Sequence, residues 1–221
     1  MKGAVIIVAG GTGSRMQSTL PKQFIELKGK PILLHTLEKF HQFDQALQLI
    51  IVMHPDFVDY WKDLCRTLNM TIPHEVVAGG AERFHSVKNG IHQVRSDVEV
   101  IAVHDAVRPM ISASTIRNCF EGAYKHKAVV PVIPLVDSLR QVTDSGNTQV
   151  DRSKFRLVQT PQCFDRLLLL RAYEQEYQKT FTDDASVVEN IDQAIFFVDG
   201  NVENVKITTK SDLAFCESLL A

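Results

Sequence analysis

A glycine-rich segment near the start of the chain is a candidate for phosphate binding. Residues 9–16 read Ala-Gly-Gly-Thr-Gly-Ser-Arg-Met, and Pro-Lys-Gln follows at 21–23. Glycines let backbone N–H groups approach phosphate oxygens closely, and the cations Arg15 and Lys22 could neutralise a triphosphate. The segment is not a Walker A loop, because no Gly-Lys-Ser/Thr closes it, and it lacks the third glycine of the dinucleotide fingerprint. An ordinary tight turn is the alternative, and the two cations favour phosphate binding.

A second polar segment, His-Asp-Ala-Val-Arg-Pro at 104–109, follows a predicted strand. A carboxylate at such a strand end, facing a phosphate loop, could hold Mg²⁺ or a substrate hydroxyl, and Asp105 is placed to do so. The alternatives are that Asp105 caps the next helix or pairs with Arg108. We interpret His104 as a loop histidine with satisfied hydrogen bonds rather than as a catalyst.

The segment Gly-Gly-Ala-Glu-Arg at 79–83, with Ser86, follows another predicted strand and opens a helix. Open backbone amides and a hydroxyl suit recognition of the edge of a nucleotide base. The alternative for Glu82 is that it simply favours the helix N-terminus. By itself this segment is a weak indicator.

Two later segments each place one polar or basic group between a strand and a loop. They are Val-Gln-Thr-Pro-Gln at 158–162 and Val-Lys-Ile-Thr at 205–208. Lys206 is either part of a site or a solvated lysine at a sheet edge.

Alternating strands and helices would bring these segments together. Short β-branched runs predict buried strands at 3–9, 48–53, 75–78, 98–103 and 128–133. Apolar stripes between them predict helices, one through Ile32, Leu33, Leu37 and Phe40 and another through Phe84, Val87, Ile91 and Val94. This order is typical of a mostly parallel α/β sheet, whose ligands bind beyond the carboxyl ends of the strands.

A hairpin interrupts this pattern between Ser138 and Arg152, where the turn signal Asp-Ser-Gly-Asn occupies 144–147. Both faces of the hairpin are too polar for a core, so we expect a projecting arm over 137–156 within a single domain of residues 1–221. After the arm, the pattern predicts helices at 165–178, near 182–186 and from 211, and strands at 194–198 and 205–208.

Composition excludes several classes of protein. A formal charge of −2 over 221 residues argues against a basic nucleic-acid-binding face. The four cysteines are far apart, which fits neither a zinc motif nor a disulfide scaffold and indicates reduced thiols in the cytoplasm. No apolar run reaches the length of a signal-peptide core or a membrane span, and we expect no membrane partner.

In order along the chain, these motifs resemble the 2-C-methyl-D-erythritol 4-phosphate cytidylyltransferase family. The resemblance rests on AGGTGSRM with PKQ, GGAER with Ser86, HDAVRP, VDR at 150–152, QTPQ, TDDAS and NVKIT. It implies a magnesium-dependent enzyme that transfers CMP from CTP to the methylerythritol phosphate in the non-mevalonate isoprenoid pathway. It also implies a three-layer α/β/α fold of the nucleotide-diphospho-sugar transferase type, with a mostly parallel Rossmann-like sheet, and a homodimer whose hairpin arms embrace.

The resemblance assigns roles to individual residues. Those implied to bind CTP are Ala9, Gly10, Gly11, Thr12, Gly13, Arg15, Lys22, Gly79, Gly80, Arg83, Ser86 and Asp105. Those implied to bind the acceptor are Asp105, Arg108, Ser138, Arg152, Thr160 and Lys206. Arg15, Lys22, Arg152 and Lys206 are the implied catalytic residues, and Asp105 is the implied metal ligand.

Two departures and three alternatives accompany the resemblance. The family more usually has Thr where Ser138 stands, and HDAVRP varies from a commoner HDAARP or HDGARP. Ribitol-5-phosphate cytidylyltransferase shares the phosphate loop, but Val-Asp-Arg at 150–152 favours the methylerythritol enzyme. A module that binds CTP without turnover is disfavoured because all the cations are present, and a Rossmann-type dehydrogenase because the third glycine is missing.

Overall fold

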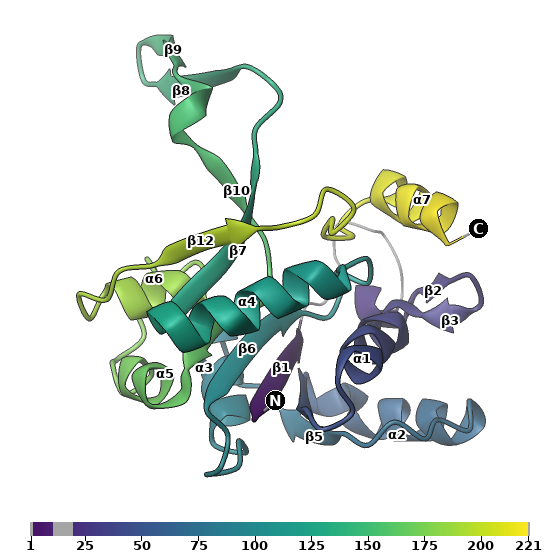
Figure 1. The fold of residues 1–221 in the computed structure, drawn as a ribbon. Helices are drawn as coiled ribbons and strands as arrows, with labels where there is room; N and C mark the ends of the chain where they lie inside the picture. Colours follow the sequence, from purple (N-terminus) through teal and green to yellow (C-terminus); the bar gives the residue numbers. More distant parts are fainter. Residues whose placement is uncertain (1, 11–19, 221) are drawn as a thin grey trace.

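A computed structural model of the chain describes residues 2–10 and 20–220. Among these residues, eight strands form a central sheet that carries helices on both faces (Figure 1). The strands are β1 (Gly3–Ala9), β4 (Gln48–Met53), β5 (Glu75–Ala78), β6 (Val100–Asp105), β7 (Ala128–Pro134), β10 (Arg156–Val158), β11 (Gln162–Asp165) and β12 (Phe196–Asp199). The helices are α1 (Ile32–Phe43), α2 (Val58–Thr67), α3 (Arg83–Ile91), α4 (Ala113–His126), α5 (Arg166–Ala172), α6 (Asp184–Glu189) and α7 (Lys210–Leu219).

Two hairpins and three short 3₁₀ helices complete the described elements. The hairpins pair β2 (Glu26–Leu27) with β3 (Lys30–Pro31) and β8 (Leu139–Thr143) with β9 (Gly146–Val150). The 3₁₀ helices are η2 (Lys22–Phe24), η3 (Pro55–Phe57) and η4 (Arg152–Lys154).

The sheet is mostly parallel, as predicted. Its central order is β7–β11–β6–β1–β4–β5, and β6, β1, β4 and β5 run parallel to one another. The exceptions are β11, which runs antiparallel between β6 and β7, and β10, which runs antiparallel to β7 on the same side. At the other side of β7 lies β12, in parallel.

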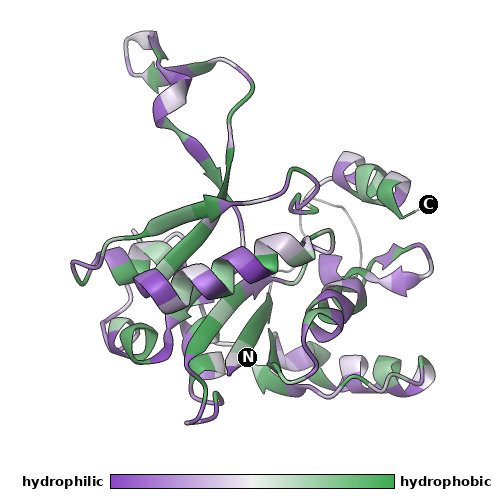
Figure 2. Ribbon diagram, viewed as in Figure 1, coloured by the Kyte–Doolittle hydropathy of each residue, from purple (hydrophilic) through white to green (hydrophobic). Residues whose placement is uncertain are grey.

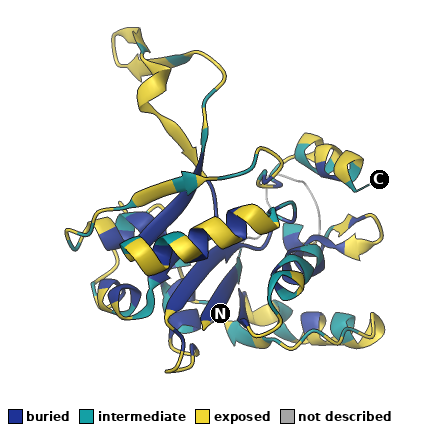
Figure 3. Ribbon diagram, in the orientation of Figure 1, coloured by how far each residue is buried: buried dark blue, intermediate teal, exposed yellow. Residues whose placement is uncertain are grey.

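Alternate residues of each central strand point to opposite faces, and this produces two apolar layers. Val5 and Ile7 of β1 pack among residues of α1, α2 and α4, whereas Ala4 and Ile6 pack among residues of α3, α5 and α6. Both sets are fully buried. The central strands are accordingly apolar in Figure 2 and buried in Figure 3. The layers confirm the predicted α/β/α arrangement and place the strand ends of β1, β4, β5 and β6 side by side.

In the C-terminal third, two predicted elements differ in the structure, and the strands β10 and β11 are present without having been predicted. Residues 205–208 do not form a strand, although the Ile207 N–H donates to the Val107 carbonyl over 2.9 Å. Ile207 is buried among Leu27, Ile32 and Cys216. This packing, rather than a place in a sheet, accounts for an apolar residue at this position. The helix predicted to reach residue 178 ends at Ala172.

The hairpin predicted around residues 138–152 is present as β8 and β9. It projects from the sheet (Figure 1), and most of its residues are exposed (Figure 3). The side chains of the arm include exposed apolar groups, among them Val142 and Phe155. No helix in the described part of the chain is long and apolar enough to cross a membrane.

Candidate active site

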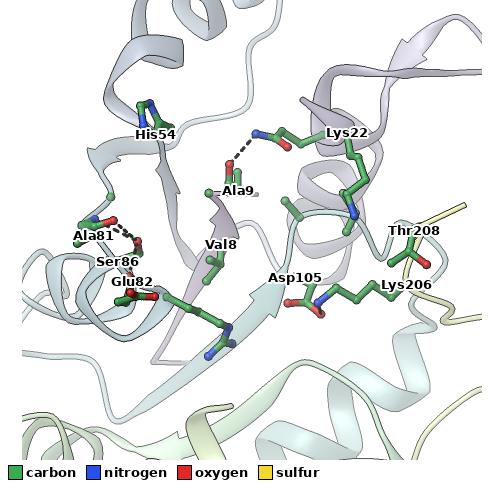
Figure 4. A pocket seen from close by; sticks show the side chains of 17 residues that line it. Val8, Ala9, Lys22, His54, Ala81, Glu82, Ser86, Asp105, Lys206 and Thr208 are labelled. Atoms are coloured by element: carbon green, nitrogen blue, oxygen red, sulfur yellow. Dashed lines mark hydrogen bonds and ion pairs between the residues drawn. The ribbon is translucent and has the colours of Figure 1, made fainter. Parts of the chain in front are cut away.

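The carboxyl ends of the parallel strands open into a cavity of about 540 Å³, seen in Figure 4. This is the position at which open α/β sheets bind ligands. Nine predicted site residues line the cavity: Ala9, Gly10, Lys22, Gly79, Gly80, Arg83, Ser86, Asp105 and Lys206. In Figure 4, Lys22 and Lys206 extend toward Asp105, while Ala81, Glu82 and Ser86 form the opposite side. The cavity therefore has a cationic side, where the two lysines lie, and a second side formed by residues 79–86, where Glu82 and Arg83 accompany the backbone and hydroxyl groups.

Asp105 is the centre of the cationic side. Its Oδ2 accepts a hydrogen bond from Arg108 Nε over 3.1 Å and lies 3.2 Å from Lys206 Nζ. The Asp105 side chain is 11% exposed, whereas that of Lys206 is 47% exposed. The pairing with Arg108, one alternative in the sequence analysis, is thus present together with a place in the cavity. The other alternative, helix capping, is wrong, because Ser112 caps α4.

The charge of Asp105 is stabilised by its neighbours. Burial alone would raise the pKa of this carboxyl, but Lys206, then Arg108 and Arg83, outweigh that effect and hold the pKa well below its ordinary value. Asp105 is therefore ionised at neutral pH, and it holds the Lys206 ammonium at the edge of the cavity.

His104 fixes the backbone beneath Asp105. Burial lowers its pKa from 6.5 to about 4, although nearby Asp105 opposes the shift, so the imidazole is neutral at pH 7. Its Nε2 lies 3.1 Å from the Arg108 carbonyl, which can only accept, so Nε2 donates. Its Nδ1 must then accept from the Thr160 hydroxyl, and that oxygen in turn accepts from the Asp105 N–H over 3.1 Å. His104 has satisfied hydrogen bonds, as predicted, but it belongs to β6 and not to a loop.

The turn between β5 and α3 requires its two glycines. A Cβ on Gly79 would lie 2.9 Å from Ser86 Oγ, and one on Gly80 would lie 2.4 Å from the Cβ of His85. The Gly80 N–H donates to Ser86 Oγ, and the Ser86 hydroxyl is 3.1 Å from the Glu82 carbonyl. The turn therefore brings backbone to the wall of the cavity with no side chain in between. Its amides are not open as expected, however, because the Gly79 N–H also donates within the protein, to the Met53 carbonyl over 2.7 Å.

Arg83 is held from behind by a buried carboxylate. Its guanidinium makes a two-pronged contact with Asp184, with distances of 2.9 and 2.5 Å, and Tyr173 donates to the same carboxylate over 2.6 Å. Asp184 is fully buried. Burial would lower the pKa of Arg83, but the Asp184 charge outweighs it and raises the pKa further. Arg83 is thus a fixed cation at the cavity wall.

The end of β1 is prepared for close approach of a ligand. The buried Gln23 side chain donates to the Ala9 carbonyl over 2.6 Å and so ties η2, with Lys22, to the strand. A Cβ added at Gly10 would meet no atom within 4 Å, so packing in the described structure does not require glycine there. Close approach of a ligand to the backbone would be a reason for glycine at position 10.

The remaining predicted site residues lie elsewhere. Arg108 and Thr160 stand behind the cavity wall, where Thr160 is 6% exposed and its hydroxyl is bonded to His104 and Asp105. Ser138 and Arg152 are on the arm, outside the cavity of their own chain, and Arg152 Nη1 donates to the Val136 carbonyl. Gly11, Thr12, Gly13 and Arg15 lie outside the described residues.

Sequence reasoning missed several residues of the cavity wall. They are Val8, Gln23, His54, Ala81, Glu82, Ala106, Val107 and Thr208. A signal existed for some of them: His54 directly follows β4, and Ala106 directly follows β6, at the strand ends where ligands bind.

The residues present fit a magnesium ion that is shared with substrate phosphates. Within the described residues, no group of three or more His, Cys, Asp or Glu side chains could hold a metal ion by itself. Mg²⁺ at nucleotide sites commonly takes only one or two carboxylates and completes its shell with phosphate oxygens and water. The ionised Asp105, whose contacts with Arg108 and Lys206 use Oδ2, fits that donor set.

Comparison with known proteins gives a consistent family. Residues 4–221 match the model of the 2-C-methyl-D-erythritol 4-phosphate cytidylyltransferase family. A protein of that name from Bacteroides thetaiotaomicron is 50% identical over 220 residues, which cover 100% of both chains. Among solved structures, 4-diphosphocytidyl-2C-methyl-D-erythritol synthase from Anaerococcus prevotii superposes with a TM-score of 0.84 at 28% identity, covering 99% of this chain and 95% of that one. The corresponding cytidylyltransferase from Thermus thermophilus gives a TM-score of 0.80 at 28% identity, with 99% and 98% covered.

Proposed function

This chain belongs to the 2-C-methyl-D-erythritol 4-phosphate cytidylyltransferase family, and we propose which of its residues perform the reaction. The enzyme transfers CMP from CTP to 2-C-methyl-D-erythritol 4-phosphate, a step of non-mevalonate isoprenoid precursor synthesis. The products are 4-diphosphocytidyl-2-C-methyl-D-erythritol and pyrophosphate. One observation supports the site above all: a single cavity joins Lys22, the Gly79–Gly80 turn and the Asp105–Lys206 pair.

The acceptor phosphate is the nucleophile. It is largely dianionic at neutral pH because its second pKa is about 6, so no general base is required. Within the described cavity, His54 is the one histidine, and no Ser-His-Asp arrangement accompanies it. The obstacle is electrostatic, since an anion must attack the α-phosphorus of a polyanion. The cations on one side of the cavity offset this repulsion, and they stabilise the charge that develops on the departing pyrophosphate.

Two groups of residues bind the two substrates. Lys22 and Arg15 bind the CTP phosphates, while the Gly79–Gly80 turn with Ser86 binds the cytosine edge. Lys206 leaves Asp105 for the acceptor phosphate, to which Arg152 of a second chain also binds. This exchange leaves the Asp105 carboxylate to accept from acceptor hydroxyls or to bind Mg²⁺, which supplies Lewis-acid charge neutralisation at the phosphates.

The assembly we propose is a homodimer in the cytoplasm. The arm keeps Arg152 outside the cavity of its own chain and carries exposed apolar groups, both of which suit a contact with a second copy. The four cysteines are free thiols, as expected in a reducing compartment.

A pyrophosphate-release assay over the four NTPs and two acceptors tests substrate choice. We expect turnover with CTP and methylerythritol 4-phosphate in the presence of Mg²⁺, and loss of turnover on chelation. Faster turnover with ribitol 5-phosphate would overturn the acceptor assignment. Binding of CTP without pyrophosphate release with either acceptor would instead indicate a nucleotide sensor.

A further inference from the structure

The segment that carries Lys206 has no regular secondary structure of its own. Residues 200–208 lie between β12 and α7 without helix or strand bonds, and Lys206 Nζ nevertheless lies 3.2 Å from Asp105 Oδ2. A lysine side chain that is 47% exposed can adopt many rotamers. Other contacts must therefore fix the backbone of this segment if the Lys206 ammonium is to be held at one position in the cavity.

Asn204 supplies the most buried of these contacts. It is 0% exposed, and its Nδ2 donates to the Thr160 carbonyl over 2.9 Å. Its own carbonyl accepts from Arg108 Nη1 over 2.8 Å and from Gln159 Nε2 over 3.3 Å. Asn204 Oδ1 has no hydrogen-bond partner among the described residues, so the side chain acts through its N–H donor.

Gln159 completes the contact from the sheet side. Its backbone N–H donates to the Pro131 carbonyl of β7 over 2.9 Å, and its Nε2 also donates to the Asn201 carbonyl over 2.9 Å. The loop backbone comes so close that a Cβ on Gly200 would lie 2.3 Å from Gln159 Oε1. Gln159 and Asn204 together form what we call the amide clamp.

The amide clamp and Asp105 share one anchor. Thr160 accepts the Asp105 N–H with its hydroxyl, and it accepts the Asn204 side chain with its carbonyl. Thr160 therefore fixes both partners of the Asp105–Lys206 ion pair: it contacts Asp105 directly and the Lys206 segment through Asn204. Neither Asn204 nor Gln159 lines the cavity, so neither can touch a substrate there.

We propose that Asn204, supported by Gln159, is a positioning residue that holds the Lys206 ammonium where it contacts the acceptor phosphate. This rests on the role proposed above for Lys206. Loss of the clamp leaves the charge of Lys206 unchanged and alters its position. Because a displacement of about 1 Å can cost up to about 100-fold, the effect on the reaction should exceed what the lost hydrogen bonds alone would cause.

The test measures steady-state kinetics of Asn204→Ala, Gln159→Ala, Lys206→Ala and the double variant Asn204→Ala/Lys206→Ala, with urea unfolding of each. The matched control is Gln48→Ala. Gln48 is also a buried amide with hydrogen bonds to Glu75 and to the Gln93 carbonyl, but it begins β4 at the opposite end of the sheet. We expect Asn204→Ala and Gln159→Ala to raise the acceptor KM on the order of 10- to 100-fold, with the KM for CTP changed less than about twofold. The control should lose stability without that shift.

The double variant separates this inference from the function on which it rests. If Asn204 acts through Lys206, removal of Asn204 adds little to the acceptor KM once Lys206 is absent. An unchanged acceptor KM in Lys206→Ala would overturn the proposed role of Lys206. Two outcomes would overturn the positioning role alone, provided that Lys206→Ala raises the acceptor KM. One is a wild-type acceptor KM in both Asn204→Ala and Gln159→Ala. The other is a double variant in which the effects of Asn204→Ala and Lys206→Ala on the acceptor KM are fully additive. Gln159→Ala decides the matter if Asn204→Ala does not fold.

Discussion

At the scale of single residues, the cavity is an arrangement of fixed charges. Asp105 keeps its negative charge because Lys206 and Arg108 surround it, and Arg83 is fixed by Asp184. In a site that excludes water, such charges need little reorganisation when the reaction charge develops. This arrangement suits a reaction whose difficulty is the approach of two anions.

Replacement of Lys22 by alanine should lower kcat far more than it weakens acceptor binding. We place this lysine at the leaving pyrophosphate, where loss of one stabilising contact costs on the order of 100-fold or more. Rapid-quench or steady-state pyrophosphate release measures the change. Lys28→Ala, which removes an exposed lysine from the turn between β2 and β3, is the matched control, and equal kcat values for the two variants would contradict the assignment.

His104 should make the protein less stable in mild acid. Its pKa falls from 6.5 to about 4 in the folded state because it is buried. Between these values the unfolded chain binds a proton that the folded protein does not, so the stability present above pH 6.5 is lost as pH falls toward 4. The difference of pKa corresponds to about 3 kcal/mol.

His104→Gln removes this titration and leaves a buried polar side chain in place. Urea unfolding at several pH values between 7 and 4 measures the free energy of unfolding of both proteins. The difference in this free energy between wild type and variant should become smaller as pH falls. Parallel curves would mean that His104 does not titrate differently in the two states.

At the scale of elements, the sequence predicted the parallel part of the sheet well and the antiparallel part poorly. Strands β1 and β4 are buried on both faces and read as continuous apolar runs, which is a clear signal. Strand β11 has only four residues and includes Gln162, whose side chain bonds Asp183 and the Ala185 N–H at the start of α6. Nothing in local hydrophobicity indicates that such a segment lies between β6 and β7.

The same distinction holds for the site. Glycine-rich turns and the cations after strands were recognisable because local chemistry requires them. The contacts behind the cavity were not, because Arg83 and Asp184 are 101 residues apart in the chain and meet only when α3 packs near α6. Likewise, Thr160 was predicted as a ligand for the acceptor, but its hydroxyl is bonded within the protein.

The link between α3 and α6 should contribute measurably to stability. Arg83→Ala leaves the fully buried Asp184 side chain with the Tyr173 hydroxyl as its hydrogen-bond donor among the described residues. We expect a loss of about 3–5 kcal/mol, the usual cost of removing one partner of a buried pair. Asp184→Ala should cost less, because 32% of the Arg83 side chain is exposed and can regain water.

The matched control is the exposed Asp63–Arg66 pair, where Arg66→Ala should change stability by no more than about 1 kcal/mol. Urea unfolding measures all three variants. Similar losses for Arg83→Ala and Arg66→Ala would show that burial of Asp184 does not make the contact important.

At the scale of the whole molecule, the arm is a large feature of the described structure that the single chain does not explain. Arg152 and Ser138 lie on it and do not line the cavity that holds Lys22 and Lys206, and Figure 1 shows its strands β8 and β9 projecting from the sheet. If a partner's arm supplies Arg152, then Arg152→Ala should raise the acceptor KM strongly and leave CTP binding nearly intact. Titration calorimetry with each substrate decides, and loss of CTP affinity with normal acceptor binding would mean that the two subsites are reversed.

A composite site can also be tested by mixing two variants at an acceptor concentration so low that each is inactive by itself. In a two-fold dimer each site would combine Lys22 of one chain with Arg152 of the other. A mixed dimer of Lys22→Ala and Arg152→Ala then collects both defects in one site and neither in the other. Random pairing makes half of the dimers mixed, so about a quarter of wild-type sites should return on symmetry grounds. The control mixes Lys22→Ala with Lys206→Ala, whose residues line the cavity of the same chain, and no activity should return. If unfolding and refolding the first pair together yields abundant mixed dimer without activity, Arg152 acts within its own chain, and the arm holds the dimer together without completing its sites.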